Sequence, residues 1–234
     1  MDPSPASPPA ERILVVVSAH DEEPRIAAVV VAVISHLPVL VVDDGSTDAT
    51  ARRAEEAGAA VLRQYPNRGK GAALQAGFRR ALDEGWDAAI TLDADGQHDP
   101  AEIPRFLRAR RETGADLVVG RRDFRQMPLS RRLANELGGR AFSWAVGRSI
   151  PDNQSGYRLL SRRLMAAMLD SRETGFELEV EMIAICLRAG WPLAWVPIRT
   201  IYTGESSHIQ PIRHFTSFVR MVRLARARMR APGP

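Results

Sequence analysis

Residues 39–48 read VLVVDDGSTD, so that four apolar residues are followed directly by acidic, glycine and hydroxyl residues. A short apolar run that ends in turn-forming residues is typical of a buried β-strand. The residues after it, Asp48–Ala57, are expected to form a helix. The stretch therefore predicts a strand, a polar turn and a helix in succession, which is the repeating unit of α/β folds.

The same unit recurs along the first half of the chain. Apolar runs predict strands at 13–17, 39–42, 60–62, 88–92 and 116–119, and helical patterns follow them at 24–35, 48–57, 70–82 and 101–112. This alternation predicts an α/β fold with a Rossmann-like, mostly parallel sheet and helices on both faces. In such sheets ligands bind beyond the carboxyl ends of the strands.

The pattern changes after Gly120. A basic stretch at 121–132 is expected to be mobile, and a helix is expected to follow it up to about Val146. Further on, the sequence predicts a polar turn at 152–156, a short segment at 157–160, helices at 162–169 and 177–189, a strand at 192–201 and a helix at 212–229. No break in composition marks a second domain, so a single domain is expected.

The composition is that of an ordinary globular protein, since 45% of the 234 residues are hydrophobic and 26% are charged. The net charge is +4, and Lys70 is the only lysine, so arginine carries nearly all of the positive charge. Arginine suits phosphate binding because its guanidinium is a rigid fork of donors. A general arginine bias of the proteome would explain the charge equally well.

Several segments limit the class of protein. Cys186 is the only cysteine, which excludes an intrachain disulfide and suggests an inert buried thiol. Residues 1–10 lack the basic and apolar regions of a signal peptide and are expected to be a disordered tail. No stretch reaches the roughly 18 apolar residues that span a bilayer, so any membrane contact is expected to be peripheral.

Three clusters of acidic and polar residues follow expected strands. They are residues 18–22 (SAHDE), 43–48 (DDGSTD) and 93–98 (DADGQH). In a parallel sheet all three lie at one edge, where so many carboxylates repel one another unless a cation is present.

Asp93 and Asp95 have a spacing that suits a metal ion. At the end of an extended strand, side chains two residues apart face the same way. One or two carboxylates, with phosphates and waters, are common ligands of Mg²⁺, and Gln97 and His98 are candidates for a further ligand. Turn formation by the Asp-Gly pairs and helix capping by Asp48 are the alternatives.

Three motifs in order resemble those of family 2 glycosyltransferases. Residues 41–48 (VVDDGSTD) are similar to the family's nucleotide-binding motif, 92–98 (LDADGQH) to its metal motif, and 67–71 (NRGKG) to the loop after its third strand. The resemblance covers about 13–202 and is nearest to the dolichol-phosphate mannosyltransferase-like subgroup. It implies a GT-A fold and inverting transfer of mannose or glucose from GDP-mannose or UDP-glucose to a polyprenyl phosphate, with Mg²⁺ or Mn²⁺.

The resemblance also assigns residues to the donor. Asp44 would contact the base or ribose of the nucleotide, with Glu22 near the same pocket. The remaining donor-binding residues would be Ala19, Asp43, Lys70, Asp93, Ala94 and Asp95, and the metal ligands would be Asp93, Asp95 and Gln97. The first cluster departs from the family's usual Pro-x-Tyr-Asn-Glu and matches it only at Glu22, so the choice between guanine and uracil stays open.

The acceptor side resembles that of the polyprenyl-phosphate subgroup at residues 120–135. A lipid phosphate is an anion that needs charge-assisted donors, for which Arg121 and Arg131 are the candidates. Solvated surface arginines are the alternative. A phosphate monoester has a second pKa of about 6, so it attacks without a general base. The protein is then left to position the reactants and stabilise charge.

Residues 152–158 (DNQSGYR) match a further segment of the subgroup. Asp152 is expected to shape the active site, and a role as general base is the alternative. Arg158 is expected to pair with a carboxylate or phosphate, or to form a structural salt bridge.

The resulting organisation has three parts. Residues 1–10 are the tail, 11–211 the glycosyltransferase domain with a donor half at 11–120 and an acceptor half at 121–211, and 212–234 a basic amphipathic helix and tail. Such a helix either packs on its own core or lies on an anionic membrane surface. A cytoplasmic protein, peripheral at the cytoplasmic face of the membrane, is therefore expected.

Other functions remain open at this point. The same donor chemistry onto a soluble or glycan hydroxyl would need Asp152 or Glu177 as a base. A non-catalytic nucleotide-sugar or anion-binding module is an alternative of another class. A pyrophosphorylase is disfavoured because residues 18–22 are acidic rather than glycine-rich. Nucleic-acid binding is disfavoured because the expected edge is acidic and RNA-binding aromatic motifs are missing from the sequence.

Overall fold

The computed structural model describes residues 11–124, 129–175, 177–199 and 201, together with 222, 223, 226, 227 and 229. Of residues 129–135 it describes the backbone but not the side chains. The tail expected at 1–10 and most of the helix expected at 212–229 therefore lie outside the described residues.

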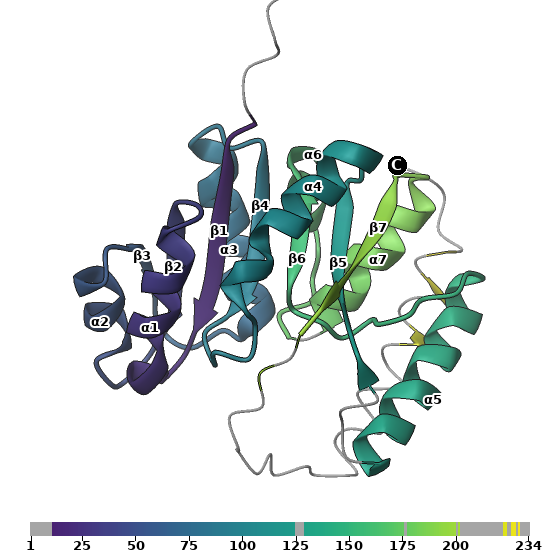
Figure 1. The fold of residues 1–234 in the computed structure, drawn as a ribbon, viewed down its shortest axis with the longest axis horizontal. Coiled ribbons are helices and arrows are strands. Elements are labelled where there is room, and N and C mark those ends of the chain that lie inside the picture. Colours follow the sequence, from purple (N-terminus) through teal and green to yellow (C-terminus); the bar gives the residue numbers. More distant parts are fainter. Residues whose placement is uncertain are drawn as a thin grey trace, which may run out of the picture.

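The chain forms a seven-stranded sheet in the order β3-β2-β1-β4-β6-β5-β7 (Figure 1). The strands are β1 (Ile13–Ala19), β2 (Val39–Asp44), β3 (Ala60–Gln64), β4 (Ala88–Asp93), β5 (Leu117–Arg122), β6 (Arg158–Ser161) and β7 (Leu193–Ile198). Only β6 is antiparallel to its neighbours β4 and β5. One sheet thus runs through both expected halves, and the predicted mostly parallel α/β fold in a single domain is confirmed.

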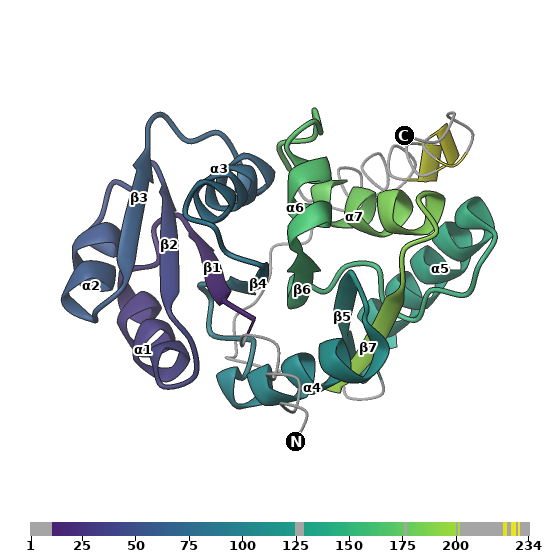
Figure 2. The ribbon, with the colours of Figure 1, turned by 90° about the horizontal axis from the view of Figure 1, so that it is seen from above.

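Helices cover both faces of this sheet (Figure 2). They are α1 (Glu23–Ile34), α2 (Thr50–Glu56), α3 (Lys70–Asp83), the 3₁₀ turn η1 (Pro100–Glu102), α4 (Ile103–Thr113), α5 (Leu129–Val146), α6 (Arg162–Met168) and α7 (Glu177–Arg188). Because successive strand residues point to opposite faces, Leu14 and Val16 pack with α3, α6 and α7, whereas Val15 and Val17 pack with α1 and α4. Each face of the sheet thus carries its own hydrophobic core.

The basic stretch after Gly120 differs from the expectation. Arg121 and Arg122 belong to β5, where they pair with Pro197 and Ile198 of β7. The backbone ladder therefore continues past Gly120 although the side chains turn polar. The helix α5 also begins at Leu129, inside the stretch that was expected to be mobile.

Close approach of α3 to the sheet depends on Gly77. A Cβ atom on Gly77 would lie 2.5 Å from Val16 Cγ1 and 3.3 Å from Val42 Cγ2. Both valines are fully buried and β-branched, so neither can move aside easily. This contact matters for the site because α3 begins at Lys70, and a shift of the helix would displace that residue.

Gly77→Ala is expected to destabilise the protein. Overpacking costs about 1–3 kcal/mol, and the better helix propensity of alanine offsets about 1 kcal/mol of it, so the free energy of unfolding should fall by up to about 2 kcal/mol. Urea denaturation followed by circular dichroism measures the change.

Gly139→Ala in α5 is the matched control. A Cβ atom there meets only Ile150 O at 3.8 Å, an ordinary contact. This variant should gain up to about 1 kcal/mol from helix propensity. A gain in stability for Gly77→Ala as well would show that α3 is not held against the sheet as described.

Candidate active site

The three acidic clusters meet at one edge of the sheet, as the sequence predicted. Strand β1 lies between β2 and β4 and is parallel to both. In this register Ala19 is the partner of Asp43, and Ser18 is the partner of Asp93. The carboxyl ends of the three strands are therefore neighbours, and the residues that follow them share one site.

Asp44 holds the loop that leads into α3. Its Oδ1 accepts hydrogen bonds from Gln64 Nε2 at 2.6 Å and the Arg68 amide at 2.8 Å, and its Oδ2 accepts one from the Gly69 amide at 2.7 Å. Gly69 has φ +94°, a conformation that favours glycine, and α3 starts at the next residue. Asp44 thus sets the position of Lys70, while its contact with a nucleotide stays a prediction.

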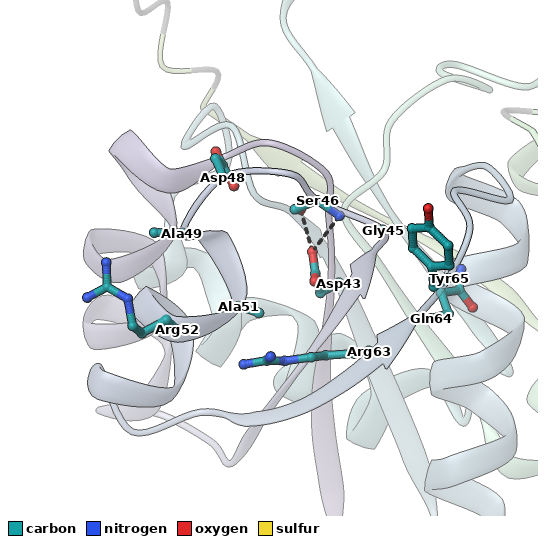
Figure 3. A pocket seen from close by; sticks show the side chains of 10 residues that line it. All are labelled: Asp43, Gly45, Ser46, Asp48, Ala49, Ala51, Arg52, Arg63, Gln64 and Tyr65. Atoms are coloured by element: carbon teal, nitrogen blue, oxygen red, sulfur yellow. Dashed lines mark hydrogen bonds between the residues drawn. The ribbon is translucent and has the colours of Figure 1, made fainter.

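Asp43 points to the opposite face of β2, as expected for consecutive strand residues. Its Oδ1 accepts a hydrogen bond from the Ser46 amide at 3.3 Å and another from the Ser46 hydroxyl. It lines a pocket of about 430 Å³ between α2 and β3, shown in Figure 3. Arg52 and Arg63 also line the pocket but already pair with glutamates of α2 at 3.0 Å. The two arginines are therefore already neutralised, and the carboxylates of Asp43 and Asp48 leave the lining with a negative charge.

Lys70 lies between two carboxylates. Its Nζ is 2.5 Å from Asp93 Oδ1 and 2.8 Å from Glu179 Oε1. Burial alone would lower the pKa of Lys70, but Asp93 and Glu179 together raise it above its usual value. Burial would likewise raise the pKa of Asp93, and the Lys70 ammonium holds it below its usual range. Lys70 and Asp93 are therefore both charged at neutral pH.

Glu179 is the member of this group that the sequence argument missed. The sequence instead suggested Glu177, two residues earlier in the first turn of α7, as an alternative base. The signal was present, because Glu179 and Glu181 interrupt an apolar run in α7 and both are buried. A buried carboxylate needs a partner, so these residues could have been marked as paired.

Gly156 allows the turn before β6 to close over this ion pair. A Cβ atom on Gly156 would lie 2.6 Å from Asp93 Oδ2 and 3.0 Å from Lys70 Nζ. The Gly156 carbonyl also accepts a hydrogen bond from Thr91 Oγ1 at 2.7 Å. Any side chain at this position would separate the turn from the charged groups.

The residues after β4 form a compact turn. Asp95 Oδ1 accepts a hydrogen bond from the Gln97 amide at 2.9 Å, and His98 Nδ1 accepts one from the Asp93 amide at 3.3 Å. Burial lowers the pKa of His98, so the ring is neutral at pH 7 and its proton lies on Nε2. His98 therefore fixes the backbone of Asp93.

The donor set fits a metal ion that arrives with its substrate. Within the described residues, no three His, Cys, Asp or Glu side chains are grouped so that they could hold a metal by themselves. Asp93 and Asp95 supply carboxylates at the strand end, which suits Mg²⁺ or Mn²⁺ completed by phosphates and water. These residues alone do not complete the coordination of a metal ion.

On the side expected to bind the acceptor, the carboxylate of Asp152 is fully engaged by Arg122. Arg122 Nε donates to Asp152 Oδ2 at 2.7 Å, its terminal nitrogen donates to Oδ1 at 2.9 Å, and its amide donates to Oδ2 at 3.2 Å. Asp152 is only 1% exposed. Arg121, on the same strand, is exposed and makes no ion pair within the described residues. The structure does not describe the side chain of Arg131.

Arg158 has a structural role rather than the expected contact with a carboxylate or phosphate. It is fully buried and donates to the backbone carbonyls of Asn153, Ser155 and Glu179. It therefore ties the turn before β6 to the first turn of α7. Sequence reasoning could not distinguish a backbone partner from a charged one.

The remaining predicted residues lie around this edge. Ala19 ends β1 and Ala94 follows β4, and both are buried. Glu22 precedes α1, where its Oε2 is 2.8 Å from Arg25. The structure thus gathers the predicted donor residues at the ends of β1, β2 and β4, while Asp43 and Asp44 face opposite sides.

Solved structures share this fold over nearly the whole chain. Glucosyl-3-phosphoglycerate synthase from Mycobacterium tuberculosis in complex with phosphoglyceric acid superposes with a TM-score of 0.72 at 23% identity, covering 95% of this chain and 81% of that one. The same synthase with Mn²⁺ and UDP-glucose gives 0.71 at 25% identity, covering 95% and 80%. The architecture is the GT-A fold, as the sequence predicted.

Curated relatives are similar in sequence. An undecaprenyl-phosphate mannosyltransferase from Micrococcus luteus is 36% identical over 72% of this chain and 74% of its own length. A polyprenol monophosphomannose synthase from Mycolicibacterium smegmatis is 31% identical over 81% and 77%. The model of the family "Glycosyl transferase family 2" matches residues 14–168. The chain therefore belongs to glycosyl transferase family 2 and is a glycosyltransferase.

Proposed function

We propose that this chain transfers a hexose, mannose or glucose, from a nucleotide-diphosphate sugar to a polyprenyl phosphate, with inversion and with Mg²⁺ or Mn²⁺. The observation that carries the proposal is the saturation of Asp152 by Arg122. A hydroxyl acceptor needs a base, and this carboxylate already accepts two hydrogen bonds from a guanidinium. A phosphate acceptor is already deprotonated and needs none.

The donor side supports a diphosphate leaving group. Asp93 and Asp95 would hold the divalent ion, which would neutralise the charge that develops on the diphosphate. Lys70 adds a partly buried ammonium at the same strand end, next to Asp93. The fold relative with Mn²⁺ and UDP-glucose supports the same class of donor.

The acceptor side supports an anionic nucleophile. Arg121 presents an exposed guanidinium at the end of β5, beside the strand residue that holds Asp152. A guanidinium there would bind the acceptor phosphate and orient it toward the sugar. The two relatives described above, named for undecaprenyl phosphate and polyprenol, support a polyprenyl acceptor.

The alternative with a hydroxyl acceptor is weaker on this geometry. Asp152 would first have to leave Arg122, which would strand a half-buried guanidinium. Glu177 remains the other candidate base, at the start of α7. A non-catalytic module is disfavoured because the chain is a member of a glycosyltransferase family.

We also propose that α5 contacts the membrane. Within the described residues, no helix is both long and apolar enough to span a bilayer. The outer face of α5 exposes Leu137 and Trp144, at 63% and 65%, together with Arg140. The guanidinium of Arg226 lies 4.2 Å from the Trp144 ring centroid. Tryptophan and arginine side by side suit the interface of an anionic membrane.

Transfer is expected to need the lipid, the metal and Asp95 together. Purified protein with Mg²⁺ or Mn²⁺ and either GDP-mannose or UDP-glucose should release nucleoside diphosphate when a polyprenyl phosphate is added. Asp95→Ala should lower this rate by about 100-fold or more, because charge stabilisation of the leaving group is lost. Release of the nucleoside diphosphate measures turnover.

Asp83→Ala is the control for this assay, because Asp83 is an exposed residue at the far end of α3. Its rate should stay within about twofold of wild type, as for most surface substitutions. If metal-dependent donor turnover occurs but the lipid never accelerates it, the acceptor assignment is wrong and hydroxyl acceptors become the next test.

Membrane binding is expected to depend on the exposed face of α5. Co-sedimentation with phosphatidylglycerol vesicles should be weakened at least about tenfold by Leu137→Glu combined with Trp144→Glu, since two apolar anchors are lost and two negative charges are added. Val31→Glu on α1, where Val31 is 59% exposed, is the matched control. Equal binding by both variants would remove α5 from the proposal.

A further inference from the structure

The Lys70 ammonium joins three elements that are distant in sequence. It lies at the start of α3, while Asp93 ends β4 and Glu179 lies in the first turn of α7. The side chain of Glu179 is 5% exposed and that of Lys70 is 17% exposed. Two carboxylates therefore share one ammonium in a nearly buried setting.

The backbone around this group is fixed. The Thr174 carbonyl, just before α7, accepts hydrogen bonds from the Gly71 amide at 2.7 Å and the Ala72 amide at 3.3 Å. A Cβ atom on Gly71 would lie 2.6 Å from the Thr174 carbonyl carbon, so the segments are in close contact. Arg158 holds the Glu179 carbonyl from the other side. The starts of α3 and α7 thus form a rigid frame, and the lysine side chain is the part that can move.

The ammonium lies on one oxygen of Asp93, which is a candidate metal ligand. Lys70 Nζ lies 2.5 Å from Asp93 Oδ1, in the position of a cation on that carboxylate. A divalent ion on the same carboxylate would repel the ammonium strongly at this distance. A buried ammonium without a counter-charge would be costly, so its displacement requires another anion within reach. Glu179, at 2.8 Å, is that anion.

We infer that Glu179 is a positioning residue that retains the Lys70 ammonium when a divalent ion takes Asp93. This inference rests on the metal dependence of the proposed function. In the donor-free protein Lys70 competes with the ion for Asp93, so the ion binds weakly. Because Glu179 keeps the ammonium paired, the exchange does not leave a buried charge alone, and the ammonium stays beside the incoming diphosphate.

Mn²⁺ affinity of the donor-free full-length protein tests this inference without any activity measurement. The electron paramagnetic resonance signal of free Mn²⁺ gives the Kd for wild type, Lys70→Gln, Glu179→Gln and the double variant. Lys70→Gln should bind Mn²⁺ about tenfold more tightly because the competing cation is gone. Glu179→Gln should bind it several-fold more weakly, because the ammonium then loses one of its two carboxylate partners and is held more firmly on Asp93.

The double variant separates competition from simple charge effects. If Glu179 acts through Lys70, Glu179→Gln should have no further effect in the Lys70→Gln background. A through-space effect of the lost charge would persist there. Glu177→Gln makes the same charge change in the same helical turn without contacting Lys70, and should alter the Kd by less than about twofold.

The outcomes distinguish this inference from the proposed function. If wild type binds no Mn²⁺ even with UDP or GDP present, both fail. If Mn²⁺ binds with the nucleotide but Lys70→Gln does not tighten binding, or Glu179→Gln has the same effect in both backgrounds, only this inference fails. Should Lys70→Gln alone not fold, the double variant must still bind Mn²⁺ more tightly than Glu179→Gln.

Discussion

The parallel pairing of β1 with both β2 and β4 is the constraint on which the site depends. It brings the carboxyl ends of three strands together and with them the acidic residues that follow each strand. Carboxylates so close together must be compensated. Lys70 compensates Asp93, and the loop amides at 68 and 69 compensate Asp44. Arg122 likewise compensates Asp152, which precedes β6. These ion pairs and hydrogen bonds largely determine the local fold of the site.

The two halves of the chain contribute different parts of this compensation. The first half supplies Asp93, Asp95 and Lys70, and the second supplies Glu179, Gly156 and Asp152. The contact between Gly71 and Thr174 locks the halves together. In the proposed function, this contact would keep the donor and acceptor sides at a fixed distance, as in-line transfer requires.

The sequence predicted the alternating strands and helices, the parallel edge and the lysine loop, because apolar periodicity and strand-end polarity are local signals. It did not predict the strand β6, since four buried residues in an antiparallel insertion leave no pattern of their own. It also missed Glu179 and assigned a charged partner to Arg158. Both depend on which distant backbone or side chain comes into contact, and that information is carried by the tertiary packing.

The strand β6 has a consequence for the order in which the chain can fold. It covers the edge of β4 and also the edge of β5, yet it is built from residues 158–161. During synthesis, the edge of β4 therefore remains unpaired until about seventy further residues have been added. Such open edges pair readily with other chains. Fragments that end after β5 would keep the acidic strand ends but lose the strand that closes the sheet, so aggregation is the characteristic failure of this architecture when its second half is delayed.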